Sequence, residues 1–360
     1  MSGGRVFLAR CLLGLAMGAV ACCASAAEDA AGTTLGGTIR VYGSGLKGLS
    51  DAWIAGFRKH HPKLKVAMNE AGSDAVAGAL HHTAADVTIS GRELTFNEYL
   101  GSGINQEVLP TEITVASGGY DVPGSSFGLV VFVNAANPLK GLTLQQLDGV
   151  FGSPRSGGYD RLTFVPHQRT KAQDIREWGQ LGLGGEWKKA PIRTHGYAYG
   201  GMGQFFQNQV FAGGDKWAES FMQYVENGTR LHVGGPAGAH TGILHMFKVI
   251  GEDRHAIGFA GMPQWVAAGR PANARPLALS FGPGQPFVLP SEATMRDRTY
   301  PLTRSVYIYV NQLPGQSLDP RVAAFIEYVL SDEGQSKVAE NGIYFPLPRS
   351  MRREELKKIR

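Results

Sequence analysis

Alternating apolar and polar positions mark two strands near the start of the chain, with helical spacing between them. Residues 38–42 and 64–68 alternate as β-strands do, while residues 49–57 carry Leu, Trp and Phe on one helical face. A second helical stretch ends at about residue 81, and residues 86–90 form a third strand pattern. The order strand, helix, strand, helix, strand predicts parallel βαβ units and an α/β fold.

Further elements are predicted along the rest of the chain. Apolar runs rich in β-branched residues predict strands at residues 112–116, 129–134, 256–260 and 305–310. Thr143 and Gln146 have the spacing of a capping box, and Asp319 before Pro320 is typical of a helix start. We expect Ser331 to cap a last helix that ends at Gly342, and residues 269–301, rich in Pro and Gly, to be irregular.

The first residues have the pattern of an export signal. Two arginines flank a basic start, and an apolar run from Cys11 to Cys23 follows. This run is too short for a membrane-spanning helix, which needs about 20 apolar residues. Ala24, Ser25 and Ala26 have the small side chains of a cleavage site. We therefore expect residues 1–26 to be a signal peptide and the rest to be periplasmic, with an uncleaved membrane anchor as one alternative.

Cysteine and charge narrow the chemistry further. All three cysteines lie in the leader. Lipid attachment at Cys22 or Cys23 is therefore a second alternative to cleavage. After cleavage the exported chain would have no thiol for disulfides, catalysis or metal binding. Removing the leader lowers the formal net charge from +5 to about +3, too mild for a nucleic-acid-binding surface. The 360 residues include 49 glycines, about twice the usual share of roughly 7 %.

Several of these glycines lie in loops that open helices. Residues 43–45 (Gly-Ser-Gly) and 72–74 (Gly-Ser-Asp) each follow a predicted strand, and residues 200–203 (Gly-Gly-Met-Gly) open a helix in the second half. A helix N-terminus offers free backbone amides and partial positive charge, which favour anions. Glycine lets the backbone approach a ligand closely, and a serine hydroxyl adds a donor. The three loops indicate an anion-binding site, and none has the nucleotide P-loop spacing.

These loops and other segments resemble a known family. The segments are residues 85–94 (ADVTISGREL), 137–143 (NPLKGLT), 150–152 (VFG), 256–260 (AIGFA), 300–304 (YPLTR) and 330–335 (LSDEGQ). On them the chain resembles the phosphate-binding substrate-binding proteins of ABC transporters, the PstS-like group. The resemblance covers about residues 37 to 350.

The resemblance implies a two-lobed type II periplasmic-binding-protein fold. Each lobe would be a mixed sheet flanked by helices, and two crossover segments would join the lobes. Lobe 1 would comprise residues 37–133 and 303–350, lobe 2 residues 134–302, and residues 351–360 would form a charged tail. The ligand would be a small oxyanion, phosphate above all, held between the lobes without covalent chemistry, cofactor or metal. An inner-membrane ABC permease would be the partner, and we expect a monomer.

The resemblance also implies which residues bind the anion. The amides of Gly45 and Leu46 and the hydroxyls of Ser44 and Ser73 would donate hydrogen bonds. The remaining candidates are Asp74, Ser90, Arg92, Arg169, Gly201 and Met202.

The chain departs from the family pattern in the second lobe. An arginine and a Ser-Gly-Thr triplet usually precede the helix there, whereas this chain has Tyr197 and residues 200–202 (Gly-Gly-Met). Gly91 also stands where some members have Asp or Ser. The positive charge must then come from elsewhere, with Arg92, Arg169 and Arg193 as candidates because a guanidinium fits an oxyanion bidentately.

Two other functions stay open on this evidence. One is a divergent binding or signalling module with a ligand other than phosphate, which the missing residues favour. The other is an exported hydrolase, although the sequence has no Gly-x-Ser-x-Gly or His-Glu-x-x-His motif.

Overall fold

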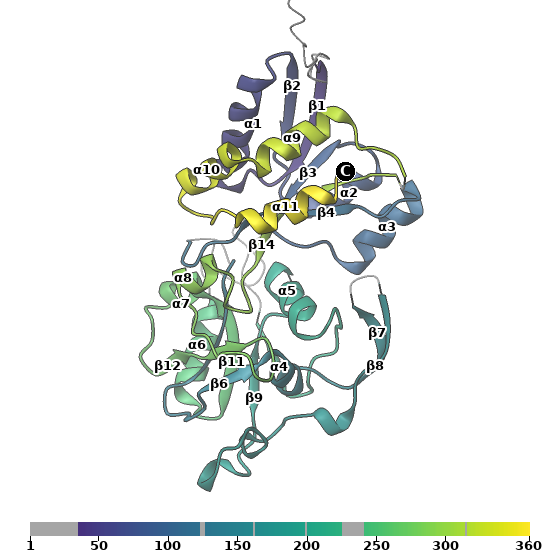
Figure 1. Ribbon diagram of the computed structural model, residues 1–360. Coiled ribbons are helices and arrows are strands. Elements are labelled where there is room, and N and C mark those ends of the chain that lie inside the picture. Colours follow the sequence, from purple (N-terminus) through teal and green to yellow (C-terminus); the bar gives the residue numbers. More distant parts are fainter. Residues whose placement is uncertain (1–34, 123–126, 161–162, 199, 225–240, 314) are drawn as a thin grey trace, which may run out of the picture. The chain divides into compact units, whose positions relative to one another are not determined.

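Parallel βαβ units open the fold, as the sequence predicts. The computed structural model describes residues 35–122, 127–160, 163–198, 200–224, 241–313 and 315–360 (Figure 1). The first elements are β1 (Gly37–Gly43), α1 (Leu49–His60), β2 (Leu64–Asn69), α2 (Val76–His81) and β3 (Val87–Ser90). β1 pairs in parallel with both β2 and β3, which confirms the predicted arrangement. The predicted signal peptide lies outside the described residues.

The first sheet includes a strand that returns from the far end of the chain. Its order is β2-β1-β3-β14-β4, with β14 (Ser305–Val310) antiparallel to both β3 and β4 (Thr111–Ser117). The helices α9 (Pro320–Leu330) and α10 (Asp332–Asn341) pack on α1, where the buried Trp53 indole donates to the Gly334 carbonyl at 2.8 Å. Helix α3 (Phe96–Gln106), which the sequence analysis missed, packs against α2.

A second five-stranded sheet has the order β10-β9-β11-β5-β12. Its strands are β5 (Leu129–Asn134), β9 (Arg193–Gly196), β10 (Met222–Gln223), β11 (Ala256–Gly261) and β12 (Ala274–Pro276). Its helices are α4 (Leu144–Phe151), α5 (Gly200–Val210), α6 (Thr241–Glu252), α7 (Met262–Ala267) and α8 (Glu292–Arg296), and a short pair, β6 (Gly141–Thr143) with β13 (Ala278–Ser280), accompanies them. The sequence analysis ended lobe 1 at residue 133, but the hydrogen bonds of β5 to β11 and β12 place the whole strand in the second sheet.

The capping residues lie where the sequence predicts them. The Thr143 hydroxyl and the Gln146 side chain form the capping box of α4, and Asp319 accepts from the Arg321 amide at the start of α9. The Ser331 hydroxyl accepts from Gly334 at the start of α10. These local rules work because each cap involves residues only two or three positions apart.

Two regions differ from the sequence analysis. Residues 269–301 contain β12, β13 and α8, and residues 349–357 form α11 (Arg349–Lys357), which packs on β4. The tail is therefore not merely a charged end: Glu355 is buried and accepts the Thr114 backbone amide at 2.8 Å. Within the described residues, no helix has the length and hydropathy to cross a membrane.

The two chain segments that run between the sheets are hydrogen-bonded to each other. The Arg304 amide donates to the Phe127 carbonyl at 2.8 Å, and the Gly118 amide donates to the Arg304 carbonyl at 2.9 Å. The Leu129 amide donates to the Leu302 carbonyl at 3.1 Å. The outgoing and returning crossovers thus lie side by side, and Arg304 is at their centre.

A hairpin projects from the second group of elements. β7 (Arg155–Asp160) and β8 (Thr163–Arg169) pair antiparallel to form a separate two-stranded sheet. Near its tip the Tyr159 ring stacks on Phe96 of α3, with ring centroids 4.5 Å apart. The hairpin therefore reaches from one sheet's group of elements to the other's.

Gly43, the last residue of β1, permits the close approach of β1 to β3. Its φ is +131°, and a Cβ built there would lie 2.0 Å from the Ile89 carbonyl oxygen. We expect Gly43→Ala to lower the free energy of unfolding by about 3 kcal/mol, because backbone strain and overlap combine. Chemical denaturation of Gly43→Ala beside Gly36→Ala, whose Cβ would meet nothing within 4 Å, checks this. Equal stability of the two variants would contradict it.

Candidate anion-binding site

Residues from both crossovers and from the glycine-serine loops line one cavity of about 350 Å³. Its lining residues are Ser44, Leu46, Lys47, Ser73, Gly91, Arg92, Phe127, Gly201, Arg304 and Tyr344. The predicted loops at residues 43–45, 72–74 and 200–203 each contribute at least one of them. The structure thus brings together three segments that the sequence only predicts to converge.

The first loop holds its backbone amides in a fixed turn between β1 and α1. The Ser44 hydroxyl accepts the Leu46 amide at 3.2 Å, and the Ser50 hydroxyl donates to the Ser44 carbonyl at 2.9 Å. Leu46 and Lys47 have φ values of 48° and 53°. Such left-handed conformations are uncommon for residues other than glycine. The turn therefore has a preset geometry, and it places Ser44 and Leu46 on the wall of the cavity.

The second loop contributes one hydroxyl. The Ser73 Oγ accepts the Gly91 amide at 2.9 Å, which ties the loop before α2 to the end of β3. Neither the Ser73 nor the Ser44 hydroxyl donates to any of the described residues. Each hydroxyl therefore has a proton to donate to an anion in the cavity.

Three further candidate residues, Ser90, Arg92 and Asp74, support the loop after β3 rather than offer hydrogen-bond donors to the cavity. Ser90 is buried, and its hydroxyl donates to the Arg92 carbonyl at 2.6 Å. Arg92 lines the cavity, but its guanidinium donates to both carboxylate oxygens of Glu98 at 2.8 and 2.9 Å and to Asp74 at 2.9 Å. These bonds raise the pKa of Arg92. Asp74 is absent from the lining, so its visible role is to hold Arg92.

The start of α5 contributes Gly201 to the lining, while Met202 is buried beside it. Tyr197, in the position of the expected arginine, is buried in the hydrophobic core of the second sheet. Tyr199 lies outside the described residues. No arginine of the second group of elements is among the lining residues that the structure describes.

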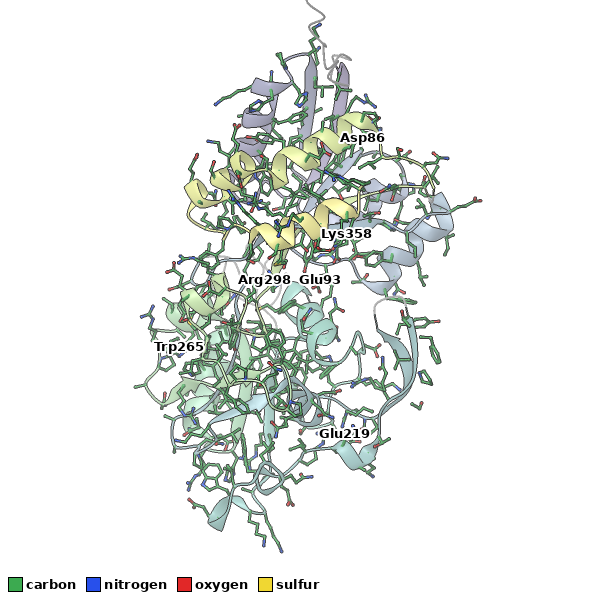
Figure 2. The ribbon with its side chains drawn as sticks, in the orientation of Figure 1. Asp86, Glu93, Glu219, Trp265, Arg298 and Lys358 are labelled. Atoms are coloured by element: carbon green, nitrogen blue, oxygen red, sulfur yellow. The ribbon has the colours of Figure 1, made fainter. Side chains whose placement is uncertain are left out.

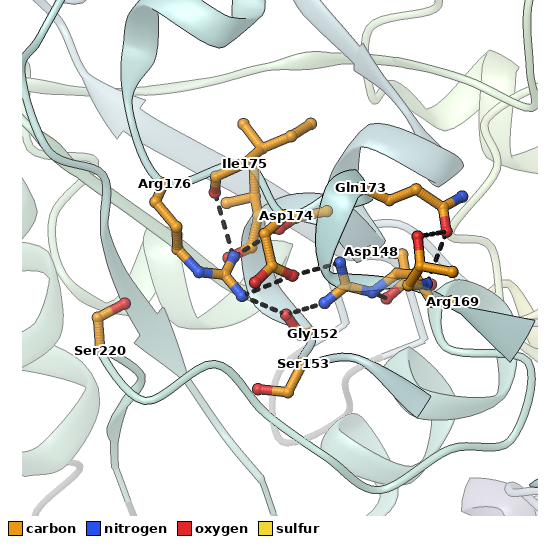
Figure 3. A network of polar contacts seen from close by, with 12 residues as sticks. Asp148, Gly152, Ser153, Arg169, Gln173, Asp174, Ile175, Arg176 and Ser220 are labelled. Carbon is orange, nitrogen blue, oxygen red and sulfur yellow. Dashed lines mark hydrogen bonds and ion pairs between the residues drawn. The ribbon is translucent and has the colours of Figure 1, made fainter. Parts of the chain in front are cut away.

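Arg169 lies in a buried network at the base of the hairpin, away from the cavity lining (Figure 3). Its guanidinium donates to Asp174 at 2.6 Å and to the Gly152 carbonyl, and its Nε lies 3.2 Å from Asp148. Arg176 donates to the same carbonyl at 2.7 Å. The expectation that Arg169 is a ligand residue therefore does not fit this geometry, because the partly buried carboxylates of Asp148 and Asp174 already hold its charge.

Arg193, the other candidate cation, is an exposed residue. It donates to Asp253 at 2.7 Å and does not line the cavity. An exposed ion pair of this kind contributes little to stability.

Two cations of the lining, Lys47 and Arg304, were not among the sequence candidates, and Arg304 is the buried one. The sequence analysis quoted it within the YPLTR segment but gave it no role. Its guanidinium lines the cavity and donates to the Gly91 carbonyl at 3.2 Å, and the side chain is buried. A buried arginine beside a glycine loop indicates a functional site, because arginines are seldom buried. The local sequence does not predict that residue 304 is buried.

Glu93 connects α5 to the rear of the site (labelled in Figure 2). Its carboxylate accepts the Asn208 amide at 2.6 Å and the Tyr307 hydroxyl at 2.9 Å, and its carbonyl accepts the Gln204 amide at 2.7 Å. Burial raises the pKa of Glu93, against the opposing effect of these hydrogen bonds and of the Arg304 charge. The helix that presents Gly201 is thereby fixed to the loop that presents Gly91 and Arg92.

The fold is that of a two-lobed periplasmic binding protein. Residues 25–333 match the PBP superfamily domain, and the chain belongs to that superfamily. It is 28% identical over 315 residues to the phosphate-binding protein PstS of Pseudomonas aeruginosa, a match that covers 87% of this chain and 84% of that protein.

Two solved structures are similar to this chain. PstS from Borrelia burgdorferi matches with a TM-score of 0.50 and 16% identity, over 86% of this chain and 99% of that chain. An ABC-type phosphate transport receptor from Vibrio cholerae matches with a TM-score of 0.46 and 19% identity, over 86% and 100%. The fold is a two-lobed type II periplasmic-binding-protein fold in which mixed sheets are flanked by helices, as the sequence analysis expected.

Proposed function

We propose that this protein is an exported solute-binding protein that captures a small oxyanion, phosphate first, for an ABC importer. The observation that carries the proposal is the convergence of three glycine-rich loops, two of them with a serine, around one cavity that also contains a buried guanidinium. Backbone amides, serine hydroxyls and an arginine are together the groups that bind tetrahedral oxyanions. The similarity to PstS over most of both chains supports the same ligand.

The binding event would need no covalent step. An anion in the cavity would receive hydrogen bonds from the Gly45 amide, the hydroxyls of Ser44 and Ser73, and the start of α5 at Gly201. The Leu46 amide, which the sequence analysis also expected to bind the anion, already donates to the Ser44 hydroxyl. Movement of the lobes about the paired crossovers would exclude water, and each of these hydrogen bonds becomes stronger in a drier environment.

We also propose the organisation that goes with this function. Residues 37–117 and 305–360 would form lobe 1, and residues 129–302 would form lobe 2, following the strands of the two sheets. The leader at residues 1–26 would direct export to the periplasm. The partner would be an inner-membrane permease that receives the anion from the closed protein.

Calorimetric titration of the purified protein with phosphate, sulfate and molybdate tests the proposal. We expect one anion per chain, phosphate bound at micromolar concentration, and an affinity that falls as salt is added. No heat with any of the three anions at millimolar concentration would contradict oxyanion capture. Saturable heat with sulfate or molybdate alone would instead identify a binding protein for another oxyanion.

A further inference from the structure

We propose that the Tyr344 hydroxyl, on the segment that follows α10, binds the oxyanion directly as a hydrogen-bond donor. This inference rests on the proposed function and adds a ligand group that the sequence analysis did not consider. The Tyr344 side chain lines the same cavity as Ser44, Ser73 and Gly201. Its hydroxyl is buried, lacks a partner among the described residues, and is in contact with open space.

The burial of Tyr344 makes its hydroxyl a feature that needs a reason. Tyr344 belongs to the hydrophobic core of the first sheet, and only 3 % of the residue is exposed. A buried tyrosine normally has a hydrogen-bond partner for its hydroxyl, because an unpaired hydroxyl away from water costs free energy. A phenylalanine would fill the same space without that cost. The hydroxyl therefore points to a partner that binds in the cavity.

Within the part of the chain that the structure describes, the Tyr344 hydroxyl forms no hydrogen bond. Burial alone raises the pKa of Tyr344, with no contribution from a hydrogen bond or a neighbouring charge. The oxygen is also not among the fully enclosed polar atoms that lack a partner, so it reaches the open space of the cavity that its side chain lines. A phenol with a raised pKa stays protonated at neutral pH. The hydroxyl therefore has a proton to donate to a ligand.

The position of Tyr344 is fixed by its neighbours. Helix α10 ends at Gly342, which has a left-handed conformation with φ of +72°. Phe345 exchanges two backbone hydrogen bonds with Ser117, at 2.9 and 3.0 Å. The Tyr344 ring meets the Phe127 ring edge to face, with centroids 5.2 Å apart. The hydroxyl is therefore held in place before a ligand arrives, so little conformational entropy is lost on binding.

Tyr344 adds a third hydroxyl to those of Ser44 and Ser73, and it comes from a separate segment of the chain. All three side chains line one cavity, and none of the three hydroxyls donates to a described residue. The cationic side chains of the lining attract anions in general, whereas hydroxyls at fixed points orient the ligand that fits. A tetrahedral oxyanion has four oxygens and can accept from donors on different walls. A hydrogen bond from Tyr344 to one of these oxygens would complete the set.

The test is Tyr344→Phe, which removes the hydroxyl and keeps the ring beside Phe127. We expect this variant to bind phosphate about 10- to 100-fold more weakly in calorimetric titration, the range for a lost hydrogen bond to a charged group. Phosphate is the probe, and sulfate or molybdate takes its place if the parent protein binds that anion instead. We also expect the ligand-free variant to be at least as stable as the parent in urea denaturation, because the substitution breaks no hydrogen bond among the described residues.

Tyr309→Phe is the matched control, because its hydroxyl has the opposite surroundings. Tyr309 is also buried, but its hydroxyl donates to Glu112 at 2.9 Å and accepts the Leu94 amide at 3.1 Å. Tyr309 is not among the residues that line the cavity. We expect Tyr309→Phe to be less stable than the parent and to bind phosphate within twofold of it. Repeating the denaturation with phosphate should show a smaller stabilisation by the ligand for Tyr344→Phe than for Tyr309→Phe.

The outcomes separate this inference from the proposed function. If the parent protein binds phosphate and Tyr344→Phe binds it within twofold, the inference is overturned and the proposed function stands. A weaker affinity that comes with a loss of stability in the ligand-free variant would also overturn the inference, because the hydroxyl would then have a structural role. If the parent binds no oxyanion at all, the proposed function fails and the inference fails with it.

Discussion

Replacing Asp148 by alanine is expected to lower the free energy of unfolding by about 3–5 kcal/mol, because it leaves buried charge without its partner. The Asp148 carboxylate accepts both terminal nitrogens of Arg155, at 3.0 and 2.5 Å, and lies 3.2 Å from Nε of Arg169. Both arginines are buried, with 3 % of each side chain exposed. Without Asp148, Asp174 is the carboxylate that remains beside Arg169.

Urea denaturation of Asp148→Ala beside Glu186→Ala measures this difference. Glu186 also binds an arginine, Arg254, through two hydrogen bonds, but both side chains of that pair are about half exposed or more. We expect the Glu186 variant to lose at most about 1 kcal/mol. Similar losses in the two variants would show that the network in Figure 3 does not stabilise the base of the hairpin.

The second large effect on the free energy of unfolding is expected from substitutions of Glu93, and the effect of Glu93→Gln depends on pH. Burial raises the pKa of this carboxyl in the folded protein. A carboxyl whose pKa is raised by folding gives its full stability below its unfolded pKa, and this stability is lost as pH rises through the folded pKa. Glu93→Gln has no such ionisation. We therefore expect Glu93→Gln to become more stable than the parent as pH rises from 4 to 8.

Glutamine fits the same hydrogen bonds. Its oxygen can accept from Asn208 and its amide nitrogen can donate to the Tyr307 hydroxyl oxygen. Glu93→Ala instead removes the acceptor of the partly buried Asn208 and of the buried Tyr307 hydroxyl, and we expect it to cost about 2–5 kcal/mol. Thermal and chemical denaturation across this pH range check both variants. Glu186→Gln, an exposed control, should differ from the parent by at most about 1 kcal/mol across this range.

Local rules predicted most of the first lobe. The strands around residues 38–42 and 86–90, the helix with Trp53, and the caps at Asp319 and Ser331 depend on neighbours within a few positions, so periodicity and capping chemistry suffice. Helix α3 was missed although Thr95 and Glu98 form a complete capping box at its start. The capping rule would have found it.

The charge of the site could not be predicted in the same way. Arg304 meets the Gly91 carbonyl across 213 residues, and Arg169 meets the Gly152 carbonyl across 17. The local sequence does not distinguish these two arginines. Only the fold places Arg169 beside carboxylates and Arg304 on the wall of the cavity. The glycine loops could be chosen from the sequence as candidate anion-binding elements because their chemistry belongs to the backbone, and all three line the cavity.

The stacked pair Phe96 and Tyr159 joins the hairpin to α3, so the two groups of elements touch at a second place besides the paired crossovers. Asp148 holds the base of the hairpin through Arg155 and Arg169, so this contact at the tip has a rigid support. An aromatic pair of this kind contributes about 1 kcal/mol. Any separation of the two groups must therefore break this contact as well as the hydrogen bonds that Glu93 accepts from Asn208 and Gln204.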